Sequence, residues 1–180
     1  MSLCTHIPFR RVKGSMIEKS IVYFETPGPE NTYKVLELVK KRAAEVGIDT
    51  VILASTRGDT AKKAMSLLNG NKLIIVGIDR ERFSADVMKT AEEKGFPVIF
   101  SNETDYHYPE EMKTAFRRFG QGMKVSVEDV VIACRKGVLE EGVDVISLAG
   151  SSRGADVAII IRSSKDFSTV KIREVICMPR

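Results

Sequence analysis

Short, nearly continuous apolar runs alternate along this chain with longer segments in which an apolar residue recurs every third or fourth position. Runs of about four to eight residues rich in Val and Ile predict strands, and the longer spacing predicts one face of a helix. We expect strands at 20–24, 50–54, 72–78, 97–101, 143–150, 157–162 and 170–178. We expect helices from about Thr32 to Val46 and at 59–69, 84–95, 110–119 and 126–142.

Several residues predict where these helices begin and end. Gly47 follows the last apolar position of the first helix and is expected to end it, because glycine readily adopts the left-handed conformation found there. Ser84 is expected to cap the helix that follows it. Ser126 is expected to cap the helix at 126–142, which places Asp129 in the first turn, where the helix dipole favours a negative charge.

The alternation predicts an α/β fold of three layers, with a mostly parallel sheet covered by helices on both faces. Because only a short link joins 157–162 to 170–178, these two strands are expected to form an antiparallel hairpin at an edge of the sheet. No linker or low-complexity tract divides the chain, so 16–180 is expected to form a single ligand-binding domain.

Residues 1–15 differ in composition from the rest of the chain. Arg10, Arg11 and Lys13 supply three of the four net positive charges of the 180 residues, and no acidic residue accompanies them. We expect this segment to be a flexible leader, and we do not expect nucleic acid as a partner. The leader lacks the apolar core of a secretory signal, and no apolar run reaches the ~20 residues that cross a bilayer, so no membrane partner is expected.

The three cysteines form neither an even set nor a C-x-x-C pair. Cys134 shares helical spacing with several valines and Cys177 lies in an expected strand, so we interpret both as small core residues. Cys4 lies in the leader. Reduced cysteines without a secretory signal predict a cytoplasmic protein.

Two similar loops stand where ligands usually bind in this fold class. STRGDTA at 55–61 and SSRGADVA at 151–158 each follow an expected strand, and ligands of open α/β sheets bind beyond the carboxyl ends of the strands. The loop TPGPENT follows the first strand in the same way. The candidate binding residues are therefore Thr26, Gly28, Asn31, Thr32, Ser55, Thr56, Arg57, Gly58, Asp59, Thr60, Gly150, Ser151, Ser152, Arg153 and Gly154.

The chemistry of these loops suits an anion. Gly58 permits a close approach of the backbone, and the amide groups of Asp59 and Thr60 are expected to lie unpaired in the first turn of a helix. A phosphate accepts hydrogen bonds from such amides and gains from the positive end of the helix dipole. Arg57 can bind two phosphate oxygens at once, and Arg153 repeats the arrangement in the second loop. Two facing loops would suit a dianion or a ligand with two polar ends.

A structural interpretation of the same residues stays open, because Ser, Thr, Gly and Asp are common wherever a strand turns into a helix. Asp59 and Asp156 would repel an anion beside them and are expected to cap amides, to pair with a loop arginine or to bind a sugar hydroxyl. The glycine motifs of the Rossmann fold and the P-loop are absent, as is G-x-S-x-G. The histidines are His6 in the leader and His107 among acidic residues, where a solvated loop and a metal cluster are the alternatives. This shortage of acid–base residues favours binding over hydrolysis.

The segment 30–68, from ENTYKVL to AMSLL, resembles the C-terminal α/β domain of pyruvate kinase, in which a helix, a strand, a similar turn and a helix follow in the same order. In allosterically activated forms of that domain the turn holds a phosphate of a sugar bisphosphate. The resemblance therefore implies a phosphate on residues 55–60. The catalytic barrel of the kinase has no counterpart here, so pyruvate kinase activity is not expected.

PGPENT, GDTA, SRGAD and EVICMPR are similar to segments of stand-alone proteins of this fold, mainly archaeal and some bacterial, with which FMN has been associated. This resemblance covers most of 16–180. It implies a five-stranded parallel core of order 3-2-1-4-5, which would bring PGPENT and GSSRGAD together. It also implies FMN as a cofactor.

We therefore expect a cytoplasmic domain that binds a phosphorylated small molecule, with FMN as the first candidate. One alternative is an enzyme that acts on a phosphorylated metabolite or uses FMN as an oxidoreductase. Another is a structural domain that forms a homo-oligomer, because this fold often contributes subunit contacts. The sequence names no reaction and no catalytic residue.

Overall fold

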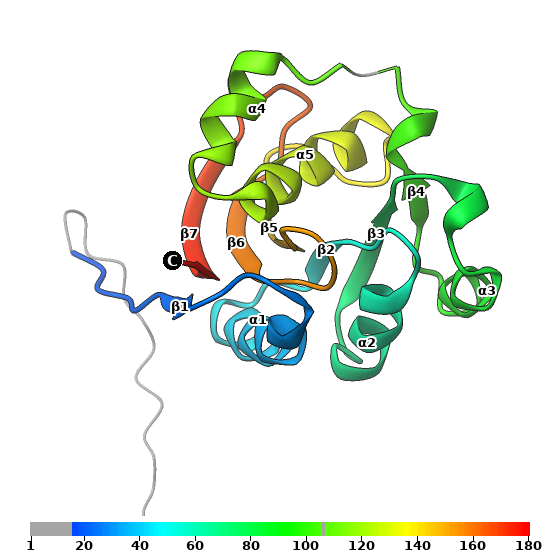
Figure 1. Ribbon diagram of the computed structural model, residues 1–180, viewed down its shortest axis with the longest axis horizontal. Helices are drawn as coiled ribbons and strands as arrows, with labels where there is room; N and C mark the ends of the chain where they lie inside the picture. Colours follow the sequence, from blue (N-terminus) through cyan, green and yellow to red (C-terminus); the bar gives the residue numbers. More distant parts are fainter. Residues whose placement is uncertain (1–15, 106) are drawn as a thin grey trace, which may run out of the picture.

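The sheet has seven strands in the order β1-β7-β6-β5-β2-β3-β4, with helices on both of its faces (Figure 1). The computed structural model describes residues 16–105 and 107–180, and the leader 1–15, with its Cys4 and His6, lies outside this part. The strands are β1 (Val22–Phe24), β2 (Thr50–Ala54), β3 (Lys72–Gly77), β4 (Val98–Phe100), β5 (Asp144–Ala149), β6 (Val157–Arg162) and β7 (Lys171–Pro179).

The helices divide between the two faces of the sheet. Helices α1, α2 and α3 cover one face, and α4 and α5 cover the other (Figure 1). Their bounds are α1 (Thr32–Val46), α2 (Asp59–Leu67), α3 (Ala85–Glu93), α4 (Glu110–Arg117) and α5 (Gln121–Arg135), with short 3-10 helices at Pro29–Asn31, Arg80–Arg82 and Ser101–Glu103. The predicted three-layer α/β fold is confirmed.

Alternating side chains of strand β2, an interior strand of the sheet, pack into two separate hydrophobic cores. Val51 and Leu53 pack into the core beneath α1, α2 and α3, whereas Ile52 packs into the core beneath α5. All three side chains are fully buried. Because successive side chains of a strand point to opposite faces, a strand buried on both faces is apolar along its buried part, as β2 is from Val51 to Leu53.

The order of the strands differs from the one that the resemblance implied. Strands β5, β2, β3 and β4 form a continuous parallel set, β6 runs antiparallel to both β5 and β7, and β1 pairs in parallel with β7. The implied order 3-2-1-4-5 is therefore wrong, because β5 occupies the place beside β2 and the three-residue β1 lies at the far edge. The predicted antiparallel hairpin of β6 and β7 is confirmed. It does not form the edge of the sheet, because β1 pairs with β7 on its outer side.

Helix α5 begins and ends earlier than the sequence predicted. It starts at Gln121, so Ser126 is a buried interior residue and not its cap, and Asp129 lies about two turns inside the helix. The segment after Arg135 turns at Gly137, whose φ of +71° ends the helix. Two predicted caps agree with the structure, since Gly47 ends α1 with a φ of 68° and Ser84 Oγ accepts a hydrogen bond from the α3 backbone. Helices α2, α3 and α4 each end two residues before the predicted position.

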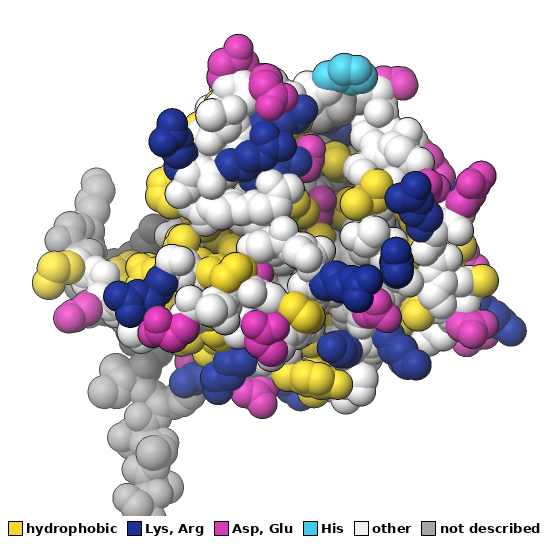
Figure 2. Space-filling view, in the orientation of Figure 1, with side chains coloured by type: hydrophobic (Ala, Val, Ile, Leu, Met, Phe, Trp, Pro, Cys, Tyr) yellow, Lys and Arg dark blue, Asp and Glu magenta, His cyan; other side chains and the backbone are white. Residues whose placement is uncertain are grey.

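None of the helices within the described ranges is long and apolar enough to cross a membrane. The surface drawn in Figure 2 carries basic and acidic side chains interspersed with one another. Cys134 and Cys177 are free and fully buried, which confirms them as core residues. Burial raises the pKa of the Cys134 thiol to about 11 and that of the Cys177 thiol to about 12, so both stay protonated and unreactive near neutral pH.

Candidate functional site

A cavity of about 640 Å³ lies beyond the carboxyl ends of β2, β3 and β5. Strands β2 and β5 are hydrogen-bonded neighbours, with Leu53 opposite Leu148. After β2 the chain continues through α2 to β3, which lies on one side of the β2–β5 pair. After β5 it continues to β6, which lies on the opposite side of this pair. This divergence opens a crevice at the point where α/β sheets commonly bind ligands. The two loops at 55–61 and 151–158, called the Ser-Arg-Gly loops from here on, meet across this crevice because the strands before them are paired.

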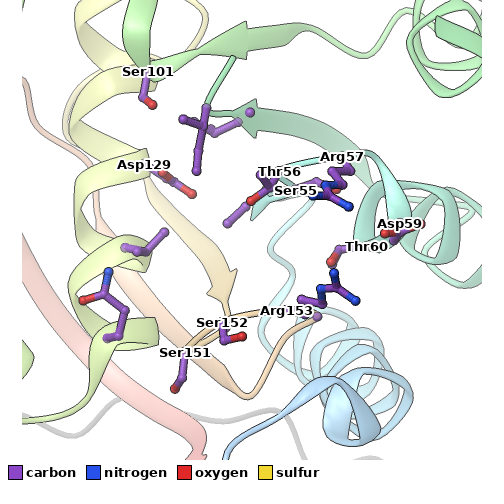
Figure 3. A pocket seen from close by; sticks show the side chains of 18 of the residues that line it. Ser55, Thr56, Arg57, Asp59, Thr60, Ser101, Asp129, Ser151, Ser152 and Arg153 are labelled. Carbon is purple, nitrogen blue, oxygen red and sulfur yellow. The ribbon is translucent and has the colours of Figure 1, made fainter. Parts of the chain in front are cut away.

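Most of the residues predicted for these two loops line the cavity (Figure 3). The lining residues from this set are Ser55, Thr56, Arg57, Asp59, Thr60, Gly150, Ser151, Ser152, Arg153 and Gly154. Gly58 is the N-cap residue of α2 and is not among the residues that line the cavity. Its φ of 102° favours glycine, and a Cβ there would come within 3.1 Å of Val87 on α3.

The beginning of α2 presents unpaired backbone donors. The Ala61 amide donates to Ser55 Oγ over 3.2 Å, so this side chain satisfies one amide of the first turn. The amides of Asp59 and Thr60 donate to no acceptor in the part of the chain that the structure describes. The side chains of Arg57 and Arg153 both line the cavity and are exposed, and neither forms an ion pair with any described residue. This end of the cavity is therefore rich in donors and positively charged.

The second loop is fastened by a buried carboxylate, Asp156. Its Oδ2 accepts hydrogen bonds from the amides of Gly28 and Ser151, each 3.1 Å long, and its Oδ1 accepts one from Ser151 Oγ over 3.3 Å. Burial raises the pKa of Asp156, while the hydrogen bonds from Ser151 and Gly28 act against that rise. The expectation that Asp156 caps turn amides is confirmed. The amide of Ser151 is thus already occupied, which leaves Ser152 and Arg153 as the free polar side chains of this loop.

The segment 26–32 supports the second loop from behind. Thr32 Oγ1 donates to the Pro29 carbonyl over 2.7 Å and accepts from the Ala155 amide over 3.0 Å. Asn31 Nδ2 donates to the carbonyl of Thr26 over 2.8 Å, within the segment itself. The predicted residues Thr26, Gly28, Asn31 and Thr32 are therefore close to the second loop but are not among those that line the cavity.

Helix α5 supplies a wall of the cavity that sequence reasoning did not identify. The lining residues on this helix are Gln121, Lys124, Val125, Glu128 and Asp129. Their spacing of three and four positions would have indicated one polar helix face if the helix had been started at its true beginning. The lining is completed by Ala54 at the end of β2, by Val76 and Gly77 at the end of β3, and by Ile78 and Ser101.

Two charged groups of the α5 wall neutralise each other, and a third has no partner. Lys124 and Glu128 form an ion pair one helical turn apart. Asp129 is only 4% exposed, and its Oδ2 has no hydrogen-bond partner among the described residues. Burial raises the pKa of Asp129 well above its usual range, and the charge of Glu128 adds to this effect, while Lys124 opposes it. The Asp129 carboxyl is therefore protonated over a wider pH range than an exposed one.

The histidine loop lies apart from this cavity. His107 is exposed, with Nδ1 3.3 Å from the Asp105 carbonyl oxygen. Residues 16–105 and 107–180 contain no group of three or more His, Cys, Asp or Glu placed to hold a metal ion. The arrangement in the described structure is that of a solvated loop.

The comparisons with known proteins concern the fold. No family model matches this chain. The crystal structure of Cryptosporidium parvum pyruvate kinase in complex with ADP is similar to it with a TM-score of 0.45 and 16% identity, over 73% of this chain and 23% of the kinase. Two other crystal structures of pyruvate kinase from this organism give TM-scores of 0.45 and 0.43 at 15% identity. The chain thus spans about a quarter of the length of these kinases. The similarity concerns the fold alone, and no activity follows from it.

Proposed function

We propose that this domain binds a phosphorylated small molecule, with the phosphate at the beginning of α2 and FMN as the first candidate ligand. The observation that carries the proposal is the pair of unpaired amides, those of Asp59 and Thr60, which open onto a cavity of about 640 Å³. A volume of this size falls within the range of about 300–1,000 Å³ that is usual for small-molecule sites.

The charges around these amides favour phosphate over a neutral group. The positive end of the α2 dipole and the two unpaired guanidinium groups of Arg57 and Arg153 all favour negative charge. A guanidinium can donate two parallel hydrogen bonds to a phosphate, and such charge-assisted bonds are stronger than neutral ones. Asp59 is exposed, so solvent screens its charge and it offsets this positive potential only in part.

The remaining surface of the cavity suits the non-phosphate part of such a ligand. Val76, Ile78 and Val125 supply apolar side chains, and Ser101 and Gln121 supply hydrogen-bonding groups. A flat ring with polar edges, such as the flavin of FMN, would find both kinds of contact. The buried, free thiols of the described residues support a reducing compartment, so we place this activity in the cytoplasm.

Native mass spectrometry of the purified protein tests the proposal most directly, because it reports a retained ligand and the oligomeric state together. Titration with inorganic phosphate and with FMN, followed by calorimetry and by quenching of flavin fluorescence, then measures the affinities. We expect Arg57→Ala to weaken both by about 1.5–3 kcal/mol, or about 10-fold to 150-fold. Arg118→Ala, which removes an exposed arginine outside the cavity lining, is the matched control.

Two results would contradict the proposal. Wild-type protein that binds neither phosphate nor FMN at millimolar concentration would remove the phosphate site. Equal affinities of the wild type and Arg57→Ala would place any phosphate elsewhere. Binding of phosphate without binding of FMN would keep the site and exclude this cofactor.

A further inference from the structure

Asp129 is a buried carboxyl group in the wall of the cavity, and its Oδ2 has no hydrogen-bond partner among the described residues. It projects from α5 into the cavity, across from Ser55 and Thr56 (Figure 3). It is 4% exposed. A buried polar group without a partner costs free energy, so native proteins seldom keep one without a function for it.

The contrast with Asp156 shows what a structural carboxylate looks like in this fold. Asp156 is also buried, and it accepts three hydrogen bonds that fasten two loops. Asp129 fastens nothing comparable. The nearest cation on its own helix, Lys124, is engaged by Glu128 and lies over the Tyr108 ring, with Nζ 5.5 Å from the ring centroid. Among the described residues, therefore, no hydrogen bond to Oδ2 and no cation free of another partner on α5 stabilises an ionised Asp129 carboxylate.

A carboxyl group in this position can offer a hydrogen bond and accept one at the same time. Burial and the charge of Glu128 raise the pKa of Asp129, which extends the neutral form to higher pH than for an exposed carboxyl group. The neutral form carries one O–H donor and one carbonyl acceptor. Such a pair matches a hydroxyl, a carbonyl or a ring amide. A ligand carboxylate would be repelled by the ionised form of Asp129, because no free cation on α5 offsets the two charges.

We propose that Asp129 is the subsite for an uncharged hydrogen-bonding group at the end of the ligand opposite its phosphate. This inference rests on the proposed function, because it takes the phosphate to lie at α2. The cavity then selects compounds with one phosphate and one neutral polar end, such as a sugar phosphate or a flavin nucleotide. It discriminates against compounds that carry a carboxylate at the far end.

The test compares three probes that share a phosphate. Inorganic phosphate reports the α2 end alone, glucose 6-phosphate adds a neutral polar end, and 6-phosphogluconate replaces that end by a carboxylate. We expect the wild type to bind glucose 6-phosphate at least tenfold more tightly than either of the other two. FMN and ribose 5-phosphate extend the set of neutral-ended probes. Isothermal calorimetry at pH 7 measures each affinity.

Two substitutions separate a binding role from a structural one. Asp129→Leu has the same number of side-chain heavy atoms and removes the unpaired polar group, so we expect a higher thermal midpoint together with at least tenfold weaker binding of the neutral-ended probes. Binding of inorganic phosphate is expected to stay unchanged. Asp129→Asn keeps a donor and an acceptor and is expected to retain binding within about threefold. Arg57→Ala is the counterpart, because it is expected to weaken all phosphate probes alike.

Several outcomes would overturn the inference. Asp129→Leu that binds every probe like the wild type would remove Asp129 from the site. A lower thermal midpoint in Asp129→Leu would show a structural role. Wild type that binds phosphate but gains nothing from any neutral-ended probe would refute the subsite and leave the proposed function standing. Failure of the wild type to bind inorganic phosphate would instead refute the proposed function, and the subsite with it.

Discussion

Replacement of Asp156 by alanine tests how the second loop is held in place. Asp156 Oδ2 joins the amide of Gly28, near the start of the domain, to the amide of Ser151, in the wall of the cavity. Alanine leaves both amides without their acceptor. Because the side chain is fully buried, water cannot reach the Gly28 amide without a local opening of the structure.

The expected loss of stability follows from these contacts. A buried amide that loses its acceptor costs about 1–3 kcal/mol, and the half-buried Ser151 amide costs about 1 kcal/mol more. Ser151 Oγ can turn to water at little cost. Removal of a carboxylate whose pKa is raised by burial returns about 1 kcal/mol of desolvation, so we expect a net loss of about 1–3 kcal/mol.

Asp156→Asn should cost only about 1 kcal/mol. Its amide oxygen can accept from both backbone amides in place of Oδ2, and its Nδ2 can donate to Ser151 Oγ. Urea unfolding at pH 7, followed by circular dichroism, measures both variants, and Asp49→Ala, in the exposed link between α1 and β2, serves as the control. A loss of less than 1 kcal/mol in Asp156→Ala, or equal losses in the alanine and asparagine variants, would refute the reasoning.

Two further predictions concern the same region. Gly154→Ala is expected to lose about 2–4 kcal/mol of stability in urea, because Gly154 has a φ of +71° and a Cβ would come within 2.3 Å of the buried Thr32 Oγ1. Gly70→Ala, which meets nothing within 4 Å, should stay within about 0.5 kcal/mol, and equal effects of the two would contradict this account. Because the pKa of Asp129 is raised in the folded state, the wild type should lose stability relative to Asp129→Asn as the pH rises from about 4 toward that raised pKa, and the difference between the two should be constant below about 4. Urea unfolding between pH 4 and pH 8 checks this, and parallel curves would exclude the shift.

The sequence was most informative where burial imposes a simple pattern. The run Thr50–Ala54 is apolar from Val51 onward because β2 is covered on both faces, and its predicted bounds are confirmed. The bounds of β6 at Val157–Arg162 agree for the same reason. The meeting of the two Ser-Arg-Gly loops also followed from a general property of parallel sheets, since ligand loops gather where neighbouring strands end.

The start of α5 was missed because tertiary packing overrides local propensity there. Gly120 and Gly122 both disfavour a helix by their intrinsic preference. In the folded protein a Cβ at Gly122 would come within 2.8 Å of Val157, so this first turn of the helix needs glycine to lie against β6. The polar face of α5 runs from Gln121 to Asp129, and it could not be predicted while the first turn of the helix was assigned to a loop.

The place of β1 was missed for a different reason. Three residues pair with β7 through Val22, Tyr23 and Phe24, and nothing in so short a run indicates its partner. The segment 26–32 illustrates a similar limit, because its turn residues suit a ligand loop and a supporting loop equally well. Its supporting contacts are made with Asp156 and Ala155, more than a hundred positions away in the sequence.

The two rims of the cavity come from segments about ninety positions apart, and the pairing of β2 with β5 alone brings them together. Neither rim exists in an unfolded chain, so a compound seated between them interacts with the native state and hardly at all with the denatured one. Occupancy and folding are therefore linked: a saturating compound at a hundred times its dissociation constant adds about 2.7 kcal/mol to the native state. Loss of that compound in a cell would consequently raise the unfolded fraction and shorten the lifetime of the whole domain.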